Sequence, residues 1–485
     1  MVNQPIMKKS IVLLLFATFL STSVSFSQKA QKISSNKKTA LESVDKHGSE
    51  LIDLSDKIWE AAEIALKENI SAKALADYAE AQGFTVERGV AEMPTAFIAT
   101  YGSGKPIIGI MGEFDALPGL SQKAVPEKST LKDGAPGHGC GHNLFGPGSL
   151  GAALAVKELI EQGKLKGTVR FYGTPAEEAV GGKIYMARAG LFNDLDACLD
   201  WHPDAENKAS TQSSQAMIEV TVEFMGQAAH AAFDPWNGRS ALDGVEAFVN
   251  GLNMFREHIK PSVRIHYIIE KGGEAPNIVP DYTRVGLYVR DATRKGMMEV
   301  YDRVLEIGEG AALIAGVDHK MTITSGYHEQ LPNIVGANLL HKNMLLVGPI
   351  SYTPEETEFA KGIQRAVKMD EKGLDGTIGG IDPTAEFPTG GSTDVADISW
   401  ITPEISLVAT TAPIGTPWHS WAVVACGGMS IGHKGMVFAA KSLALTMVDL
   451  FENESIRKAM RDEFLEKRGD YVYKAILPEG PPPVR

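Results

Sequence analysis

Two hydrophobic patterns divide this chain, and they constrain its fold more than any other feature of the sequence. Between residues 41 and 211, short apolar runs alternate with segments of helical periodicity. The runs lie at 107–111, 169–172 and 197–199. They are typical of strands buried on both faces of a parallel sheet. This alternation predicts an α/β domain with a mainly parallel sheet.

The pattern changes between residues 212 and 330. Apolar and polar residues alternate at 218–224, 263–269, 283–289 and 321–325. Such alternation is typical of strands with one solvated face. Helical segments near 239–257 and 294–315 separate them, in the order strand, helix, strand, strand, helix, strand. This order predicts a ferredoxin-like α+β domain.

The α/β pattern returns after residue 331, with a strand at 405–408 and a helix at 434–451. We therefore expect residues 41–211 and 331–485 to form one domain, into which the domain of residues 212–330 is inserted.

The first 27 residues predict a cleaved export signal. Lys8 and Lys9 precede an apolar run at 11–20, and small residues stand before Gln28, where a signal peptidase would cut. The run is about half the length that crosses a bilayer, so a membrane anchor is the weaker alternative. We expect a periplasmic protein with no stable membrane span. Residues 28–40 predict a flexible linker and the proline-rich residues 477–485 an irregular tail.

The charge balance excludes one class of partner. The chain has 47 basic and 60 acidic residues, a net charge of −13, and loss of the export signal would make it more negative. Such a protein is not expected to bind nucleic acid. The three cysteines, Cys140, Cys198 and Cys426, are too few for a disulfide framework even in an exported chain.

Four short motifs carry residues that ligate metals. They are Gly-Cys-Gly-His at 139–142, Pro-Ala-Glu-Glu at 175–178, Trp-His-Pro at 201–203 and Pro-Trp-His-Ser at 417–420. Each motif alone is more often structural. They share a placement after predicted strands or at helix starts, and loops at the carboxyl ends of parallel strands converge on one crevice. Three imidazoles, a thiolate and a carboxylate would suit two ions such as zinc or manganese.

Seven motifs occur in order along the chain, at 112–117, 137–143, 177–178, 201–203, 228–232, 392–395 and 415–419, and the resemblance that they carry covers nearly all of the mature chain. They resemble the aminoacylase and carboxypeptidase family of zinc metallopeptidases, in its amidohydrolase branch. The resemblance implies that two divalent ions, zinc or manganese, are bound by five ligands: Cys140, His142, Glu178, His202 and His419. It also implies a catalytic domain with an inserted lid and dimerisation domain.

The resemblance makes Glu177 the general base. Neighbouring side chains in an extended loop point apart, so Glu178 can hold a metal while Glu177 faces the water that the metal acidifies. In the peptidase branch, a His that binds the metal stands two residues before an Asp. In this chain the residue two positions before Asp115 is Glu113, so that His is missing. We expect the Cys-Gly-His motif to replace the missing ligand. We expect Asp115 to orient a metal ligand without binding the metal itself.

The inserted domain carries three further expected residues. By resemblance, His230 reaches the substrate carbonyl, often in the other subunit, which implies a homodimer or an assembly with a paralogous subunit. Asn277 and Arg290 match the family's substrate-binding Asn and Arg. A guanidinium group suits bidentate capture of a substrate carboxylate. We expect the eight other histidines to be structural or on the surface: His47, His138, His258, His266, His319, His328, His341 and His433.

These residues predict hydrolysis of the amide bond of an N-acyl or N-aroyl amino acid, such as aminobenzoyl-glutamate. A dipeptidase or carboxypeptidase needs the same metals and the same carboxylate clamp, so it remains an alternative. A non-catalytic binding subunit is the alternative from another class. Loss of Glu177 or of a ligand would favour it, and none of these residues is lost.

Overall fold

The computed structural model describes residues 33–382, 388 and 391–483, and the expected signal peptide at 1–27 lies outside these residues. Helix α1 (Ser35–Ala61) begins within the predicted linker, capped by Ser34, whose side chain accepts a hydrogen bond from the Lys37 backbone nitrogen. The prediction of a linker over 28–40 is therefore wrong from residue 35 onward. The helix buries Ala40 and Val44 on one face. This amphipathic pattern is not visible in the first residues of the helix, which are polar.

The larger sheet has seven strands in the order β1-β2-β4-β3-β5-β11-β6. Its four central strands are parallel. They are β4 (Gly167–Gly173), β3 (Ile107–Gly112), β5 (Ala197–Asp204) and β11 (Glu404–Thr410). Three edge strands are antiparallel to their neighbours: β1 (Thr85–Arg88), β2 (Phe97–Ser103) and β6 (Lys208–Ala209). The predicted mainly parallel sheet is confirmed at the centre.

Helices cover both faces of this sheet, which explains why its central strands contain continuous apolar runs. One face packs against α2 (Asn69–Ala81), α3 (His142–Glu161), α7 (Ile334–Val347) and α11 (Ser430–Glu452), and α1 packs on α3 and α11 in the same core. The other face packs against α4 (Gly182–Arg188) and α9 (Val395–Ser399). The remaining helices of this domain are α8 (Pro354–Ala366), α10 (Trp421–Gly427) and α12 (Glu454–Arg468).

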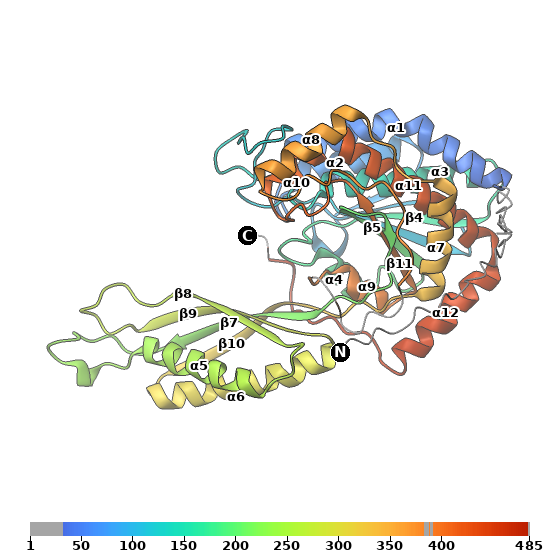
Figure 1. Ribbon diagram of the computed structural model, residues 1–485. Coiled ribbons are helices and arrows are strands. Elements are labelled where there is room, and N and C mark those ends of the chain that lie inside the picture. Colours follow the sequence, from blue (N-terminus) through green and yellow to red (C-terminus); the bar gives the residue numbers. More distant parts are fainter. Residues whose placement is uncertain (1–32, 383–387, 389–390, 484–485) are drawn as a thin grey trace, which may run out of the picture. The chain divides into compact units, whose positions relative to one another are not determined.

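The second sheet is antiparallel, with strand order β10-β7-β9-β8. Its strands are β7 (Ala216–Met225), β8 (Arg264–Lys271), β9 (Tyr282–Asp291) and β10 (Asp318–Tyr327). Helices α5 (Ala241–Phe255) and α6 (Arg294–Ala315) lie side by side along it (Figure 1). This is the ferredoxin-like order that the alternating pattern predicts, with a hydrophobic core of its own.

No single helix among the described residues is long and apolar enough to span a membrane, although α10 and α11 pass that test together as a bent pair.

Candidate metal centre

Four predicted motifs meet at the carboxyl ends of the parallel strands. Asp115 follows β3, Glu178 follows β4, and His142 opens α3. His202 lies inside β5, and not after it as the sequence predicts. The strand continues to Asp204 because β11 pairs with it over its whole length. The apolar run at 197–199 marks only its first residues, since the strand becomes polar toward the site.

The Cys-Gly-His motif forms a tight left-handed turn. Gly141 has a φ of 80°, and a Cβ atom there would lie 2.8 Å from Pro203. Only glycine permits this conformation and this approach at low cost. Cys140 and His142 are thereby brought against the strand that carries His202. The backbone nitrogen of His419 donates to the carbonyl of Gly139 at 2.9 Å, which attaches the last motif to the same turn.

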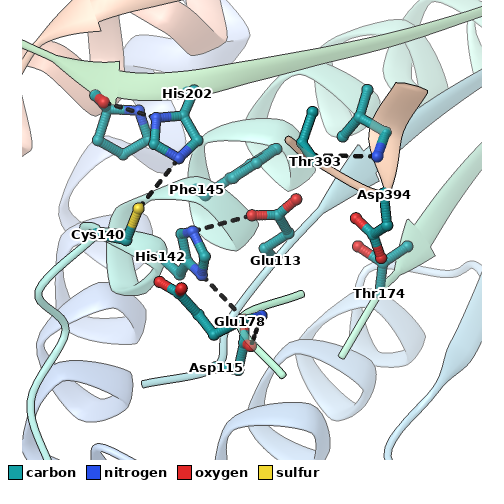
Figure 2. A network of polar contacts seen from close by, with 12 residues as sticks. Glu113, Asp115, Cys140, His142, Phe145, Thr174, Glu178, His202, Thr393 and Asp394 are labelled. Atoms are coloured by element: carbon teal, nitrogen blue, oxygen red, sulfur yellow. Dashed lines mark hydrogen bonds and ion pairs between the residues drawn. The ribbon is translucent and has the colours of Figure 1, made fainter. Parts of the chain in front are cut away.

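The five predicted ligands fall into two overlapping groups. Potential ligand atoms of Cys140, His142 and His202 lie within 4.8 Å of one another, and so do those of Cys140, Glu178 and His419. The Cys140 sulfur lies 3.3 Å from Nε2 of His202, and Nε2 of His419 lies 3.5 Å from Oε2 of Glu178. Figure 2 shows Cys140, His142 and His202 pointing toward one another. Cys140 belongs to both groups.

Two of the imidazoles are oriented by hydrogen bonds at Nδ1. Nδ1 of His142 lies 2.9 Å from Oδ1 of Asp115, and Nδ1 of His202 lies 2.7 Å from the carbonyl oxygen of Pro203. Since each partner is an acceptor, Nδ1 of each ring carries a proton. Nε2 is then the atom that each ring presents to the cluster, as a metal-binding histidine requires.

Several polar atoms in this cluster are buried without a hydrogen bond among the described residues. They include Oε1 of Glu178, and also Nε2 of His142 and Oε2 of Glu113, which face only each other at 3.0 Å. A buried polar atom left unsatisfied costs about 1–3 kcal/mol. A divalent cation would satisfy all three atoms, and a mixed set of sulfur, nitrogen and oxygen donors suits zinc and related ions. The residues therefore fit a metal centre.

The protein surroundings shift the titration of these groups. Burial, with the charges of Asp115 and Glu113, raises the pKa of Glu178 to about 7. Burial also raises the pKa of the Cys140 thiol above its usual range. Burial and the charge of His142 lower the pKa of His202 to about 4, so this ring is neutral near pH 7. A divalent cation opposes the first two shifts because it favours a thiolate and a carboxylate as ligands.

Glu177 lies beside this cluster, with a carboxyl oxygen within 4.8 Å of ligand atoms of His142 and Glu113. Burial and the charges of Glu113 and Glu178 raise its pKa well above the usual value. The preceding residue, Ala176, has a φ of 63°, a left-handed conformation that is strained for alanine. Glu177 and Glu178 lie in a turn, where the nitrogens of Val180 and Gly181 donate to the Ala176 carbonyl, and not in the extended loop that the sequence predicts.

Two buried carboxylates hold the turn. Oε1 of Glu68 accepts a hydrogen bond from the Ala176 nitrogen at 2.9 Å, and Oδ2 of Asp115 accepts one from the Glu178 nitrogen at 2.9 Å. Sequence reasoning does not identify Glu68, which lies directly before α2 and outside every motif. Its burial in the folded chain is the only signal, and that burial depends on contacts distant in sequence.

Sequence reasoning also misses a buried lysine. The Nζ atom of Lys183 lies 2.5 Å from Oε1 of Glu113 and 2.7 Å from Oδ1 of Asp394. The Lys183 side chain is fully buried. Asp394 belongs to the motif at 392–395, but the motif alone assigns it no role. The position of Asp394 before a helix could suggest that it forms a buried ion pair. The sequence does not indicate that Lys183 is the partner.

His230 and Asn277 lie together on the lid. The Ala231 nitrogen donates to the carbonyl oxygen of Asn277 at 3.0 Å. Nδ1 of the exposed His230 ring accepts from the nitrogens of Ala232 and Phe233 at 3.2 and 3.1 Å, so its proton lies on Nε2, which can donate outward. Within the described residues, these hydrogen bonds of His230 stay inside its own loop, and none of them reaches the cluster.

Arg290 lies near the end of β9, as predicted, and it is partly buried. Its Nη1 atom donates to Oγ of Ser392 at 3.0 Å, and its buried Nε atom has no hydrogen-bond partner among the described residues. Ser392 belongs to the same motif as Asp394. The guanidinium group thus retains donors that could bind a carboxylate.

A parallel α/β domain with a buried cluster of Cys, His and Glu side chains, interrupted by a ferredoxin-like domain, defines a metal-dependent hydrolase. Comparison with known proteins agrees, since the model of the Peptidase family M20/M25/M40 matches residues 109–334. The chain is 37% identical over 457 residues to one subunit of p-aminobenzoyl-glutamate hydrolase from Escherichia coli (strain K12), covering 89% of this chain and 95% of that protein. The chain belongs to this peptidase family, and it is a metal-dependent enzyme that hydrolyses amide bonds.

Two further comparisons extend the relationship. The chain is 29% identical over 450 residues to the Xaa-Arg dipeptidase of Homo sapiens, covering 87% of this chain and 90% of that protein. Among solved structures, a dinuclear metal binding peptidase of the M20 family from Bacillus subtilis superposes with a TM-score of 0.58 at 17% identity. That superposition covers 84% of this chain and 99% of the other, and it shows the shared fold.

Proposed function

We propose that this enzyme cleaves the amide bond between an aroyl group and an amino acid with a free carboxylate, and that aminobenzoyl-glutamate is its substrate. The proposal rests on the position of Glu177 beside a buried group of potential metal ligands, of which Nε2 of His142 and Oε1 of Glu178 have no hydrogen bond among the described residues. The substrate follows the 37% identical relative, whose name states that it hydrolyses p-aminobenzoyl-glutamate.

Cys140, His142, Glu178, His202 and His419 would hold the metal, which is zinc or manganese in this proposal. Two ions would account for the two overlapping ligand groups. A divalent ion supplies an acidified water molecule and polarises the scissile carbonyl. Glu177 takes the proton of that water and transfers it to the leaving nitrogen. The raised pKa of Glu177 suits a group that must both accept and return a proton.

Arg290 would bind the free carboxylate of the amino acid. Its bond to Ser392 fixes one nitrogen of the guanidinium group, while the buried Nε atom has no hydrogen bond among the described residues and is available to the substrate. Asn277, on the lid, would contact the same part of the substrate. His230 would donate from Nε2 to the carbonyl oxygen as negative charge develops there.

We further propose a homodimer, or an assembly with a paralogous subunit, formed through the lid. Edge strand β8 exposes Ile268 and Ile269, with 65% and 48% of their surface accessible. An exposed apolar edge strand favours pairing with another chain. Assembly would let His230 act in the active site of the neighbouring subunit.

Export to the periplasm is part of the proposal. If residues 1–27 are a signal peptide, the protein recovered from a bacterial host begins near Gln28. Intact-mass measurement tests this, and a mature chain that keeps Met1 or Met7 would contradict it.

A substrate panel tests the activity itself. The purified, metal-loaded protein is assayed with aminobenzoyl-glutamate, N-acetyl amino acids and dipeptides that end in arginine, because the Xaa-Arg dipeptidase is also similar. We expect the highest kcat/KM with aminobenzoyl-glutamate. Preference for the dipeptides would instead support a dipeptidase. Binding of aminobenzoyl-glutamate without any turnover would support a non-catalytic subunit.

A further inference from the structure

Glu113 is a buried carboxylate that the proposed mechanism does not use. It follows β3 directly, and only 1% of its surface is accessible. Figure 2 shows its carboxylate pointing toward the His142 ring. Sequence reasoning assigns no role to this position and treats it as the place of a missing ligand.

One carboxylate oxygen of Glu113 forms an ion pair with Lys183. Oε1 lies 2.5 Å from Nζ of Lys183, which lies 2.7 Å from Oδ1 of Asp394. The Lys183 backbone nitrogen also donates to Oδ2 of Asp394 at 2.9 Å. The ammonium group is therefore held between two carboxylates, with its own backbone tied to one of them. This arrangement fixes the direction of the second oxygen of Glu113.

The second oxygen of Glu113 faces a ring nitrogen of His142. Oε2 of Glu113 lies 3.0 Å from Nε2 of His142, and neither buried atom has another partner among the described residues. Nδ1 of His142 is directed to Asp115, so Nε2 is the atom that faces Glu113. Without a metal, a proton on Nε2 joins the two atoms as an ion pair, and a divalent cation in place of that proton would contact both.

We infer that Glu113 is a further ligand of the metal centre, sharing an ion with His142, and that Lys183 is the positioning residue that directs it. Bonds from zinc to nitrogen and oxygen are about 2.0–2.2 Å, so two ligand atoms of one ion stand roughly 3 Å apart. Oε2 and Nε2 have this separation. Glu177 also has a carboxyl oxygen within 4.8 Å of both, which would leave the base next to the same ion.

The inference rests on the proposed metal centre, so its test compares three variants of the full mature chain. Glu113→Gln removes the charge of the ligand. Glu113→Asp keeps the charge opposite Lys183 but withdraws the carboxylate from His142, so it covers the case in which Glu113→Gln does not fold. Glu404→Gln is the matched control, since Glu404 is similarly buried but begins β11, at the opposite end of the sheet.

Zinc and cobalt affinities are measured by competition with a chelator, zinc content by elemental analysis, and ligand geometry by the visible absorption of the cobalt-loaded protein. We expect Glu113→Gln and Glu113→Asp to weaken metal binding at least ~10-fold and to change the cobalt spectrum. We expect Glu404→Gln to behave as the parent protein does.

Unchanged or tighter metal binding in both Glu113 variants would overturn the inference, because Glu113 would then only pair with a protonated His142. Cys140→Ser, measured in parallel, separates this failure from a failure of the proposed centre. If Cys140→Ser also keeps full metal content and the parent cobalt spectrum, the proposed centre itself is wrong. If Cys140→Ser loses metal while both Glu113 variants keep it, only the role of Glu113 is wrong.

Discussion

Oδ1 of Asp115 lies 2.9 Å from Nδ1 of His142, and Oδ2 of Asp115 accepts a hydrogen bond from the backbone nitrogen of Glu178. One fully buried side chain therefore orients a proposed nitrogen ligand and the residue that supplies a proposed oxygen ligand. Its position explains how residues from β3, β4 and α3 can keep a fixed geometry around one site.

Asp115→Asn should weaken metal binding by about 10–100-fold while the protein stays folded, because an amide cannot accept hydrogen bonds at both positions. Chelator competition measures the affinity. Asp196→Asn is a suitable control, since Asp196 accepts the backbone hydrogen of Ile107 at the opposite end of β3. Equal affinities in the two variants would show that Asp115 does not orient the ligands.

Arg290→Ala should cost on the order of 2–4 kcal/mol in transition-state binding, measured as the loss in kcat/KM, because the substrate carboxylate loses its guanidinium partner. With a substrate whose carboxylate is amidated, the variant and the parent protein should have similar kcat/KM values. Arg284→Ala serves as control, since Arg284 lies on the same strand and pairs with Glu270. An equal loss with the amidated substrate would exclude Arg290 as the clamp.

The proposed action of His230 across subunits can be tested by mixing two inactive variants. His230→Ala removes the donor to the developing oxyanion, and Glu177→Gln removes the base. After subunit exchange, mixed dimers contain one active site with both residues intact, so activity should return. If exchange is demonstrated by mass and the mixture stays inactive, His230 acts within its own chain or has no catalytic role.

Glu68 predicts a pH effect on stability. Burial and the charge of Asp115 raise its pKa to about 8 in the folded protein, from about 4.5 in the unfolded chain. Between these values the folded state holds a proton that the unfolded state has lost. The contribution of Glu68 to the free energy of unfolding therefore falls as pH rises from 4.5 to about 8.

Glu68→Gln mimics the protonated carboxyl group and can still accept the hydrogen bond from Ala176. Compared with the parent, its free energy of unfolding should be similar near pH 5 and higher near pH 9, by on the order of 2–4 kcal/mol. Urea unfolding of both metal-loaded proteins at the two pH values measures this. A difference that does not change with pH would show that Glu68 is ionised throughout.

The sequence predicts the architecture well because hydrophobic periodicity reports burial directly. The central strands, the inserted domain and its element order follow from runs such as 107–111 and 218–224, which lie within β3 and β7. The start of the first helix escapes prediction because residues 28–40 are polar, and its buried face becomes regular only after Ala40. Periodicity detects an amphipathic helix poorly at a solvated end.

The candidate site is predicted in part. Motifs identify Cys140, His142 and Glu178, and the convergence of strand ends explains why they meet. Glu68 and Lys183 could not be found in this way, because their roles depend on contacts with residues more than 60 positions away. A single sequence carries no signal for such a pairing until the fold brings the partners together.

In the proposed mechanism, Glu177 moves protons at a metal centre to which it does not itself bind. Metal content and the turnover of aminobenzoyl-glutamate are therefore measured in the same preparation of Glu177→Gln. The variant should contain as much metal as the parent protein and should lose ~100-fold or more of kcat, because an amide cannot accept the proton. Turnover within a few-fold of the parent at equal metal content would show that Glu177 is not the general base.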